Sequence, residues 1–488
     1  MACNLLTTWY GPGSRFSSLH LGALRKHRAI LHRPQAPSRS FSSSARTSLR
    51  SSELTADHFA SLRANSDRLW NDIHSTADFG IGKRYGTAPE QTGVSRLTLT
   101  EDDSKARQWF HDTAGSLGCE VTTDNIGNMF AIRPGLKNDV PATFVGSHLD
   151  TQPTGGRFDG VLGVCAGIEM LRTLNDNWIE TEAPVGVVNW TNEEGARFPC
   201  SMMGSGVWAG AVDYKDALNL RDVADEKVTI KEALQHRGLC DARPAAVRSG
   251  GVPIAGHFEL HIEQGPVLQS SSRAVAAVTG VQAYEWFRIS VQGAACHAGT
   301  TPLRNRQDPL LFAAKFMANA REIARSKEGL VTFGCIKASP GSVNTVPDYV
   351  ELTMDVRHRT DKGLLTLIEA LQNCETETGI DIEFERIFQS PATMFSPLAI
   401  EMVRKSIAST GNEPIDIVSG AGHDSVNTSK HCPTAMIFVS CKDGVSHHPT
   451  EWASKQDCAT GTNVVIESVL RFDQWRQRNH FTTTSVHV

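Results

Sequence analysis

The chain has 488 residues, 40% of them hydrophobic and 21% charged, which is the composition of a globular protein with roughly two or three domains. Its net charge of -5 argues against nucleic acid as a partner. No uncharged apolar run reaches the roughly 18 residues of a membrane-spanning helix, so a membrane is not an expected partner either. The eleven cysteines form no C-x-x-C pair, which is typical of free thiols in a reducing compartment.

Residues 1–52 differ in kind from the rest of the chain, because they contain no Asp or Glu but seven Arg, one Lys and many Ser. Their charge of +8 leaves -13 for residues 53–488, since -5 - 8 = -13. Arg-rich, Ser-rich and acid-free N-termini are typical of organelle transit peptides. We therefore predict a mitochondrial transit peptide over 1–52. The alternative is a disordered basic tail on a cytoplasmic protein.

Residues 55–278 alternate between helical and strand-like patterns. Apolar spacing predicts helices over 55–78 and 100–118, the second opened by a Thr and three acids. The elements predicted after them are the strands 119–122, 128–133, 142–145 and 184–190, the helix 161–174, and two short helices at 214–218 and 230–237. Such alternation predicts an α/β domain with a mixed or parallel sheet flanked by helices.

Residues 279–391 follow a different pattern. The strands predicted there are 286–291, 330–337, 349–356 and 380–388, and the helices are 308–326 and 361–377. Their order, βαββαβ, is that of the ferredoxin-like split unit. Beyond them a strand-like stretch at 435–441 leads into a further polar motif. We therefore predict a discontinuous catalytic domain, formed by 55–278 and 392–488, with 279–391 inserted.

Polar side chains follow several of the strand-like stretches, where functional groups collect in doubly wound α/β folds. His148 and Asp150 end one strand, and at i and i+2 on an extended backbone the carboxylate can orient the imidazole. Asp159 precedes a helix, where it is either an N-cap or a carboxylate that bridges two cations. The alternative for His148 and Asp150 is an ordinary surface turn.

Glu193 and Glu194 follow the strand 184–190. Adjacent acids usually form a solvated face. Because their side chains leave the backbone in different directions, one suits a metal ligand and the other a general base. His261 lies in an alternating stretch, 257–265, that also fits a half-exposed strand, and one of His447 and His448 is incidental. Together three histidines and several acids can hold two divalent metals.

Three residues outside these stretches are further candidates. His297 lies among small residues just after a strand, where a lone histidine is more often structural than catalytic. Arg357 lies on the face of its strand opposite Val350 to Val356, and is either an exposed charge or a clamp for a carboxylate. Asn344 fits a turn as well as a substrate contact.

The motifs taken together resemble one family. They are similar to the carbamoylase and allantoate amidohydrolase branch of the M20-type di-metal amidohydrolases, which are related to aminoacylase and the zinc exopeptidases. That branch includes N-carbamoyl-L-amino acid hydrolases and yeast-type β-alanine synthases. The stretches that carry the resemblance are 146–151 (GSHLDT), 155–160 (GGRFDG), 192–195 (NEEG), 261–265 (HIEQG), 297–299 (HAG), 344–347 (NTVP), 355–357 (DVR), 419–424 (SGAGHD) and 446–451 (SHHPTE).

The resemblance implies a role for each candidate residue. Asp159 would bridge two metals, with Glu194 and His447 completing one and His148 and His261 the other. Glu193 would be the general base, and Asp150 the partner of His148. The inserted domain would be a lid and the dimerisation domain. From it His297 would face the developing oxyanion, in its own or the neighbouring subunit, while Asn344 and Arg357 grip the substrate carboxylate. Gln264 is a further substrate contact.

The activity that the resemblance implies is hydrolysis of the ureido C–N bond of an N-carbamoyl amino acid, which gives the amino acid, carbon dioxide and ammonia. Allantoate or ureidoglycolate is the alternative substrate. A dipeptidase is less favoured because His261 stands where the related peptidases carry an acid, and a non-catalytic homologue is the remaining alternative. Zinc is the default metal for such ligands, and manganese, cobalt or nickel can serve.

Overall fold

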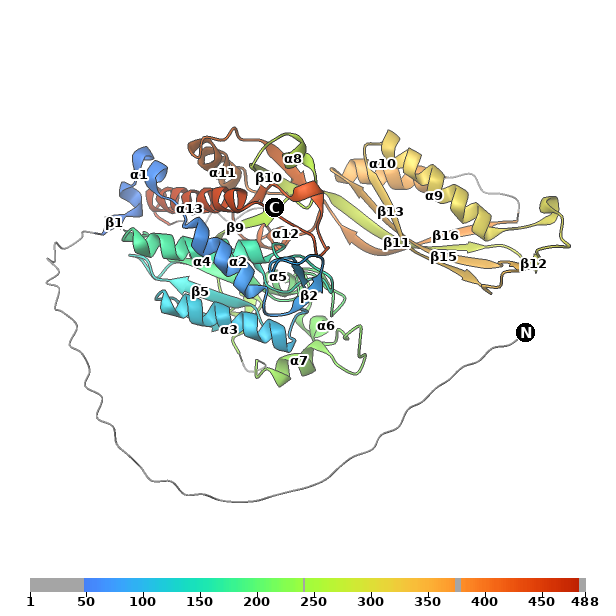
Figure 1. Cartoon of the computed structure of the whole chain (residues 1–488), viewed down its shortest axis with the longest axis horizontal. Coiled ribbons are helices and arrows are strands. Elements are labelled where there is room, and N and C mark those ends of the chain that lie inside the picture. Colours follow the sequence, from blue (N-terminus) through green and yellow to red (C-terminus); the bar gives the residue numbers. More distant parts are fainter. Residues whose placement is uncertain (1–47, 240–241, 374–378, 482–488) are drawn as a thin grey trace, which may run out of the picture. The chain divides into compact units, whose positions relative to one another are not determined.

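The structure is a computed structural model that describes residues 48–239, 242–373 and 379–481 (Figure 1). The transit peptide predicted over 1–52 falls almost entirely outside the described residues. Within them, no helix has both the length and the apolar character needed to cross a bilayer.

A mixed nine-stranded sheet forms the centre of the catalytic part, in the order β17-β10-β19-β9-β6-β8-β5-β4, with β18 beside β10. The four strands in its middle, β8, β6, β9 and β19, run parallel to one another. The pairs β4–β5, β5–β8, β10–β19 and β10–β17 are antiparallel, and β10–β18 is parallel. Their bounds are β4 Glu120–Thr123, β5 Met129–Arg133, β6 Ala142–His148, β8 Val185–Trp190, β9 Ile254–Ile262, β10 Val275–Val281, β17 Thr393–Met394, β18 Asp416–Ser419 and β19 Thr434–Val439. The predicted mixed sheet is confirmed.

Helices cover both faces of this sheet, and every residue of β6, β8, β9 and β19 is buried. On one face α4 contacts β6 and β8, and α13 contacts β9 and β19. On the other, α5 and α12 pack near β9 around Trp190 and Trp208. The helices are α3 Glu101–Ser116, α4 Val161–Asp176, α5 Met203–Ala209, α6 Tyr214–Leu218, α7 Ile230–His236, α8 Val267–Ser270, α11 Pro397–Ser409, α12 Ser425–Thr428 and α13 Lys455–Arg478. Burial on both faces explains why β19 and most of β8 are continuous apolar runs in the sequence.

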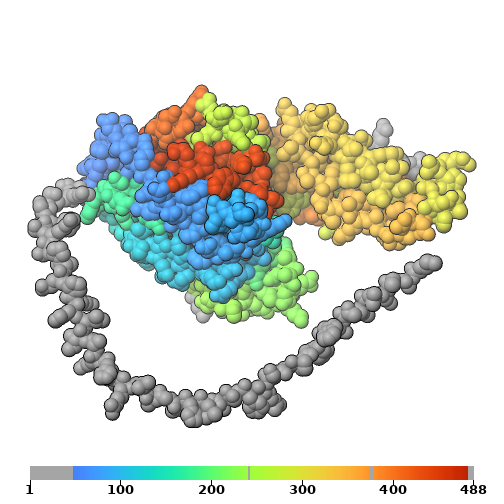
Figure 2. Space-filling view, viewed as in Figure 1, coloured from blue at the N-terminus to red at the C-terminus, as the bar shows by residue number. Residues whose placement is uncertain are grey.

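The N-terminal helical stretch differs from its prediction. In place of one helix over 55–78, the structure has α1 (Ala56–Ser61) and α2 (Ser66–Thr76). Asn65 separates them, because its side chain accepts hydrogen bonds from the amides of Asp67 and Arg68 and so begins α2. Figure 2 shows this blue segment beside the red C-terminal segment, and the Lys455 ammonium of α13 pairs with Asp67.

Residues 283–390 form a second, smaller sheet. Its elements follow the order β11 (Ala283–Gln292), α9 (Pro309–Ser326), β13 (Leu330–Ser339), β15 (Tyr349–His358), α10 (Asp361–Gln372) and β16 (Asp381–Ser390). The predicted βαββαβ order is confirmed, except that α10 ends at Gln372 and 374–378 lie outside the described residues. The strands pair antiparallel as β13-β15-β11-β16 and bury one apolar face under the two helices. The domain boundaries stay a prediction.

Candidate metal centre and active site

The candidate ligands come from the ends of parallel strands. His148 ends β6, Glu193 and Glu194 follow β8, His261 is the penultimate residue of β9, and His447 follows β19 by a longer loop. Because β8, β6, β9 and β19 run parallel in register, their carboxyl ends meet at one edge of the sheet. The structure therefore brings together side chains that are up to about 300 residues apart in sequence.

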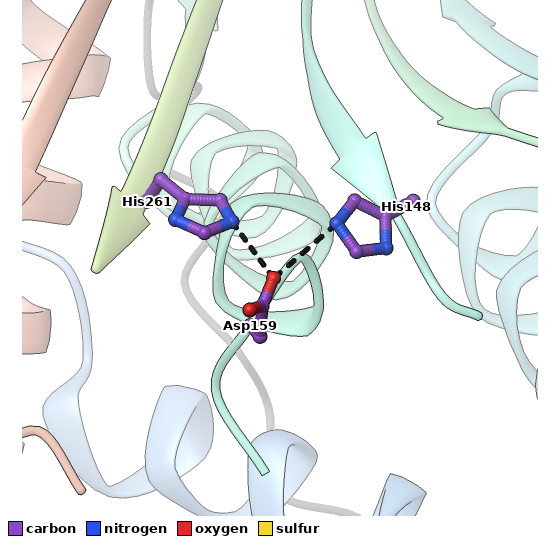
Figure 3. A group of neighbouring side chains, drawn as sticks. All are labelled: His148, Asp159 and His261. Atoms are coloured by element: carbon purple, nitrogen blue, oxygen red, sulfur yellow. Dashed lines mark hydrogen bonds and ion pairs between the residues drawn. The ribbon is translucent and has the colours of Figure 1, made fainter. Parts of the chain in front are cut away.

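Asp159 lies between two of these histidines (Figure 3). Its Oδ1 is 3.0 Å from His261 Nε2 and 3.5 Å from His148 Nε2. The ring Nδ1 atoms face main-chain carbonyls instead, at 2.8 Å from Asp150 O and 2.8 Å from Ile262 O. Since a carbonyl only accepts, each Nδ1 donates its proton there, which leaves each Nε2, beside Asp159 Oδ1, as the ring atom that a cation would contact. These three residues form one candidate ligand group.

The second oxygen of Asp159 belongs to another group. Asp159 Oδ2 lies 3.5 Å from His447 Nε2, which in turn is 3.4 Å from Glu194 Oε2. Asp159, Glu194 and His447 form this second candidate group. Asp159 thus offers one oxygen to each group. It is not an N-cap, because the helix α4 is capped by Gly160 without a side-chain hydrogen bond.

The donor atoms fit divalent cations. Bonds of about 2.0–2.1 Å from zinc to nitrogen or oxygen place ligand atoms about 3.3 Å apart in a tetrahedron. The distances from Asp159 to His148, His261 and His447, 3.5, 3.0 and 3.5 Å, lie close to that value. Burial, together with the nearby Asp159 carboxylate, raises the pKa of Glu194 to about 8. A buried group of carboxylates short of positive charge is the electrostatic setting in which cations bind.

Glu451 holds Asp159 in place, a role that sequence reasoning missed. Its Oε1 accepts hydrogen bonds from the amides of Phe158 and Asp159, both at 3.0 Å. The Ser446 hydroxyl lies between Glu451 Oε2, at 2.9 Å, and Asp159 Oδ2, at 3.0 Å. Glu451 is itself buried, and its hydrogen bonds hold the loop that carries Asp159 in place. Its place in the 446–451 motif was the only signal in the sequence.

Asp150 makes different contacts from those predicted. Its carboxylate lies 3.9 Å from His148 Nδ1, and the shorter contact to that ring comes from the Asp150 main-chain carbonyl. The carboxylate instead accepts from the amides of Glu193 and Glu194, both at 3.3 Å. Asp150 therefore positions both the histidine of one group and the acid pair that follows β8.

Glu193 stands beside the first ligand group without belonging to it. Its Oε2 is 3.6 Å from His148 Nε2. The side chain is buried, and burial raises the pKa of Glu193 well above its usual value even though His148 opposes this. Glu193 and Glu194 thus point to different places, as their adjacency predicted.

A cavity of about 290 Å³ opens onto both ligand groups, and we call it the metal cavity. It brings Glu193, Gln264 and Arg357 within reach of the candidate ligands. Gln264 donates to Asp159 Oδ2 at 2.7 Å. The remaining lining residues are Gln152, Asp159, Glu194, Ser201, Met202, His261, Tyr284, Trp286, Ala421, Gly422, His423 and His447.

Arg357 is held in a fixed orientation at the rim of the metal cavity. Its Nε and Nη2 donate to the two oxygens of Asp355 at 2.9 and 2.7 Å, and its Nη1 donates to Gly420 O at 2.7 Å. The guanidinium lies 4.8 Å from the centre of the Tyr284 ring. Of the five N–H groups of a guanidinium, these contacts use three and leave one on each terminal nitrogen. That pair suits the two oxygens of a carboxylate.

His297 and Asn344 do not line the metal cavity of their own chain. Both lie at a small two-stranded antiparallel sheet formed by β12 (Cys296–His297) and β14 (Thr345–Val346), and both are exposed. His297 Nδ1 accepts from the amides of Gly299 and Thr300 at 3.0 and 3.2 Å. Their predicted roles toward substrate stay predictions.

The sequence analysis did not predict several buried polar groups that lie next to the candidate ligands. β9 is buried along its whole length, so the half-exposed strand considered for 257–265 is wrong. Its Glu259 accepts from the hydroxyls of Ser147 and Ser425 at 2.7 and 2.6 Å. His423 lines the metal cavity with its ring 4.6 Å from that of His261. The 419–424 motif was noticed, but nothing in it indicated which residue reaches the site.

The buried His257 should make the free energy of unfolding depend on pH. Burial lowers the pKa of His257 to about 4, so below pH about 6.5 the unfolded chain binds a proton that the folded chain does not. The free energy of unfolding should therefore fall as the pH is lowered, by about 2–3 kcal/mol between pH 7 and 4.5 from this residue. His257→Gln should remove that part of the dependence. Urea unfolding of metal-free protein at both pH values measures it, and an unchanged dependence in the variant would refute the assignment.

The fold and the site define the class of the protein first. It is an α/β protein whose parallel strands end at two candidate metal-ligand groups that share one carboxylate. Residues 144–471 match the family described as peptidase family M20/M25/M40. The chain belongs to this family, whose enzymes are metal-dependent.

Named relatives share most of their length with the chain. It is 35% identical to an N-carbamoyl-L-amino-acid amidohydrolase of Rhizobium meliloti, over 84% of this chain and 96% of that protein. It is 28% identical to a ureidoglycolate hydrolase of Arabidopsis thaliana, over 83% and 86%. Among solved structures, a hydantoinase/carbamoylase family amidase of Burkholderia multivorans matches with a TM-score of 0.77 and 38% identity, over 84% of this chain and 98% of that one.

Proposed function

We propose that the protein hydrolyses the carbamoyl C–N bond of N-carbamoyl amino acids and releases the amino acid, carbon dioxide and ammonia. The observation that carries the proposal is one cavity in which two candidate ligand groups, a buried glutamate and a fixed arginine face one another. Relatives at 30–35% identity that are named N-carbamoyl-L-amino-acid amidohydrolases support it.

The proposed cofactor is a pair of divalent ions, of which zinc suits nitrogen and carboxylate ligands best. His148 and His261 would hold one ion, Glu194 and His447 the other, and Asp159 would contact both. Divalent ions bound there acidify a water molecule and polarise the substrate carbonyl. Manganese, cobalt and nickel also bind such ligands.

The residues of the chain supply the remaining steps. Glu193 takes a proton from the water that attacks the carbamoyl carbon, and returns it to the amino nitrogen when the C–N bond breaks. The carbamate formed decomposes to carbon dioxide and ammonia. Arg357 holds the substrate carboxylate through its two free N–H groups, and Gln264, which lines the same cavity, contacts the substrate as well. Hydrogen bonds hold Arg357 and Gln264 in place before substrate arrives, so little reorganisation of these two side chains accompanies the reaction.

Arg357→Lys tests the carboxylate clamp. A lysine ammonium keeps the positive charge. It cannot form a two-pronged hydrogen-bonded pair with Asp355 and a second one with the substrate carboxylate, as a guanidinium can. We expect KM to rise by about tenfold or more with a smaller change in kcat. Steady-state kinetics on an N-carbamoyl amino acid measure both constants. Arg386→Lys is the matched control, because Arg386 lies on the same sheet and does not line the metal cavity. Equal KM values for the Arg357 variant and wild type would remove the assignment.

A substrate panel tests the proposed function itself. Ammonia release from N-carbamoyl amino acids is expected with metal-loaded protein, and chelator should abolish it. Allantoate and ureidoglycolate are the second candidate substrates, because the ureidoglycolate hydrolase is among the relatives. Faster turnover of either would replace the proposal. Absence of turnover on every substrate with both metals bound would favour a non-catalytic homologue.

We further propose that the part formed by 279–391 is a lid through which two chains associate. In this arrangement His297 and Asn344, which do not line their own metal cavity, would serve the site of either subunit. Light scattering is expected to give the mass of a dimer. Mixing His297→Ala chains with Glu193→Gln chains should restore part of the activity if His297 acts across the dimer, and no activity if it acts within its own chain.

The basic, acid-free segment 1–52 supports the proposal of import into mitochondria. Fusion of 1–52 to a fluorescent protein should direct that protein to mitochondria. A diffuse cytoplasmic signal would favour the alternative location.

A further inference from the structure

A second cavity adjoins the metal cavity, and we call it the side-chain cavity. It has a volume of about 620 Å³, against about 290 Å³ for the metal cavity. The two cavities adjoin each other, because six residues line both: Gln152, Glu194, Ser201, Met202, Tyr284 and Trp286. Its volume lies within the roughly 300–1,000 Å³ of ordinary ligand pockets. The chemistry proposed for the metal cavity uses none of this additional space.

The walls of the side-chain cavity are largely apolar. On the side of the small sheet, the Trp286 and Phe388 rings lie 4.7 Å apart, and Phe388 stacks on Tyr284 at 5.5 Å. The Phe388 side chain nevertheless remains 37% exposed. On the side of the large sheet the cavity is lined by Pro199, Met202, Ala211, Val212 and Val426. Exposed aromatic surface inside a concave site is the surface that an apolar ligand group covers.

Charged groups in the side-chain cavity are few. Glu194 lies at the end nearest the candidate metals, where it belongs to a ligand group. Lys430 is the basic residue of the lining, and its ammonium donates to Asn427 Oδ1 at 3.1 Å. The composition of the lining therefore favours an apolar occupant over an anionic one.

The rings of Tyr284, Trp286 and Phe388 form an aromatic wall of the side-chain cavity. This wall contacts the residues of the carboxylate clamp, Arg357 and Asp355. Trp286 Nε1 donates to Asp355 Oδ2 at 2.9 Å, and the same Asp355 holds Arg357. Tyr284, which lines both cavities, lies under the Arg357 guanidinium. A carboxylate on Arg357 therefore places its own carbon atom beside the aromatic wall. In an α-amino acid the side chain branches from the carbon that carries the carboxylate, so it reaches the side-chain cavity. A β-amino acid without a side chain would leave that cavity unfilled.

We propose that the side-chain cavity receives the substrate's side chain, and that the preferred substrates are N-carbamoyl α-amino acids with a bulky apolar or aromatic side chain. This inference rests on the proposed function and specifies its substrate class. Phe388, Trp286 and Met202 determine the specificity by covering the side chain, while the metal cavity carries out the reaction.

Kinetics on four substrates test the inference with wild-type protein. N-carbamoyl-L-phenylalanine should have a kcat/KM about tenfold or more above those of N-carbamoylglycine and N-carbamoyl-β-alanine, because the aromatic wall is then covered. N-carbamoyl-L-glutamate should fall below N-carbamoyl-L-phenylalanine as well. Equal values for the phenylalanine and glycine compounds, or the highest value for the glutamate compound, would overturn the inference. Cleavage of N-carbamoylglycine would still uphold the proposed function.

Two variants locate the effect in the side-chain cavity. Ala211→Trp fills the space, and Phe388→Ala removes part of the wall. Each should lower kcat/KM for N-carbamoyl-L-phenylalanine by about tenfold and change that for N-carbamoylglycine much less. Ile387→Ala is the matched control, because Ile387 is the exposed neighbour of Phe388 and does not line the cavity. Equal losses on both substrates in the two cavity variants would overturn the inference. Absence of activity on all four N-carbamoyl substrates in metal-loaded wild-type protein would instead refute the proposed function.

Discussion

Glu193→Gln is expected to lower kcat by about 10²–10⁴-fold while both metal ions stay bound. Glutamine keeps the size of the side chain but cannot accept the proton from the attacking water. Glu193 lies beside the His148 ligand group at 3.6 Å without being part of either group, so its loss should leave the ligands in place. Steady-state kinetics give kcat, and elemental analysis of the purified variant gives the metal content.

Glu194→Gln is the sharpest contrast to that variant, because it changes the neighbouring acid in the same way. Glu194 belongs to the second ligand group, so this variant should lose one metal equivalent as well as activity. The two variants would then differ in metal content, although both would lose turnover. Near-normal kcat for Glu193→Gln would mean that another group is the base, and loss of metal in that variant would make Glu193 a ligand.

Asp159→Asn is expected to have the largest effect on metal binding. An aspartate offers one negatively charged oxygen to each ligand group, whereas an asparagine offers a single neutral oxygen and an amide that cannot bind a cation. We therefore expect both metal equivalents to be lost and activity to fall by about 10³-fold or more. The main-chain amide of residue 159 donates a hydrogen bond to Glu451. This bond does not involve the side chain of residue 159, so it should keep the loop in place in the variant.

The measurements for Asp159→Asn are metal content and activity with increasing added zinc. Ser446→Ala is the matched control, because the Ser446 hydroxyl contacts Asp159 Oδ2 without belonging to a ligand group. This control should keep both equivalents. If Asp159→Asn retained two equivalents, or lost only one, a bridging carboxylate would not describe the site.

The sequence was sufficient to predict which side chains meet at the candidate metal centre. His148, Glu194 and His447 follow strands whose apolar runs are recognisable, and the parallel order of those strands brings their ends to one edge. The strand pattern left Asp159 and His261 open, and their assignment as ligands came from the resemblance to the amidohydrolase family. The βαββαβ order of 283–390 followed from clear alternation between strand and helix periods, because its strands bury a single face.

Other features depended on tertiary contacts that no local pattern records. Glu259 alternates with apolar residues, which is the pattern of a residue that faces solvent, yet it is buried. Its carboxylate accepts hydrogen bonds from the hydroxyls of Ser147 and Ser425, which lie more than a hundred residues away in the sequence on either side. The break between α1 and α2 was hidden by apolar residues that keep helical spacing across Asn65. The strand β10 and the helices α11 and α13 were not assigned, since α11 and α13 bury broad faces against the sheet and β10 is buried on nearly its whole length.

The placement of His297 and Asn344 illustrates a further limit. Their motifs resemble those of substrate-binding residues, but neither residue lines the metal cavity of the same chain. A sequence motif indicates chemistry, whereas the distance between two sheets is set by the contacts across them. Arg357 differs, because Asp355 and Gly420 together fix its side chain at the rim of the cavity.

Anomalous diffraction from crystals grown with zinc tests the central claim most directly, namely that five side chains hold two divalent ions around Asp159. We predict two peaks about 3.5–4 Å apart, one beside His148 and His261 and one beside Glu194 and His447, with Asp159 between them. A fully active enzyme with a single peak, or with peaks away from Asp159, would contradict the account.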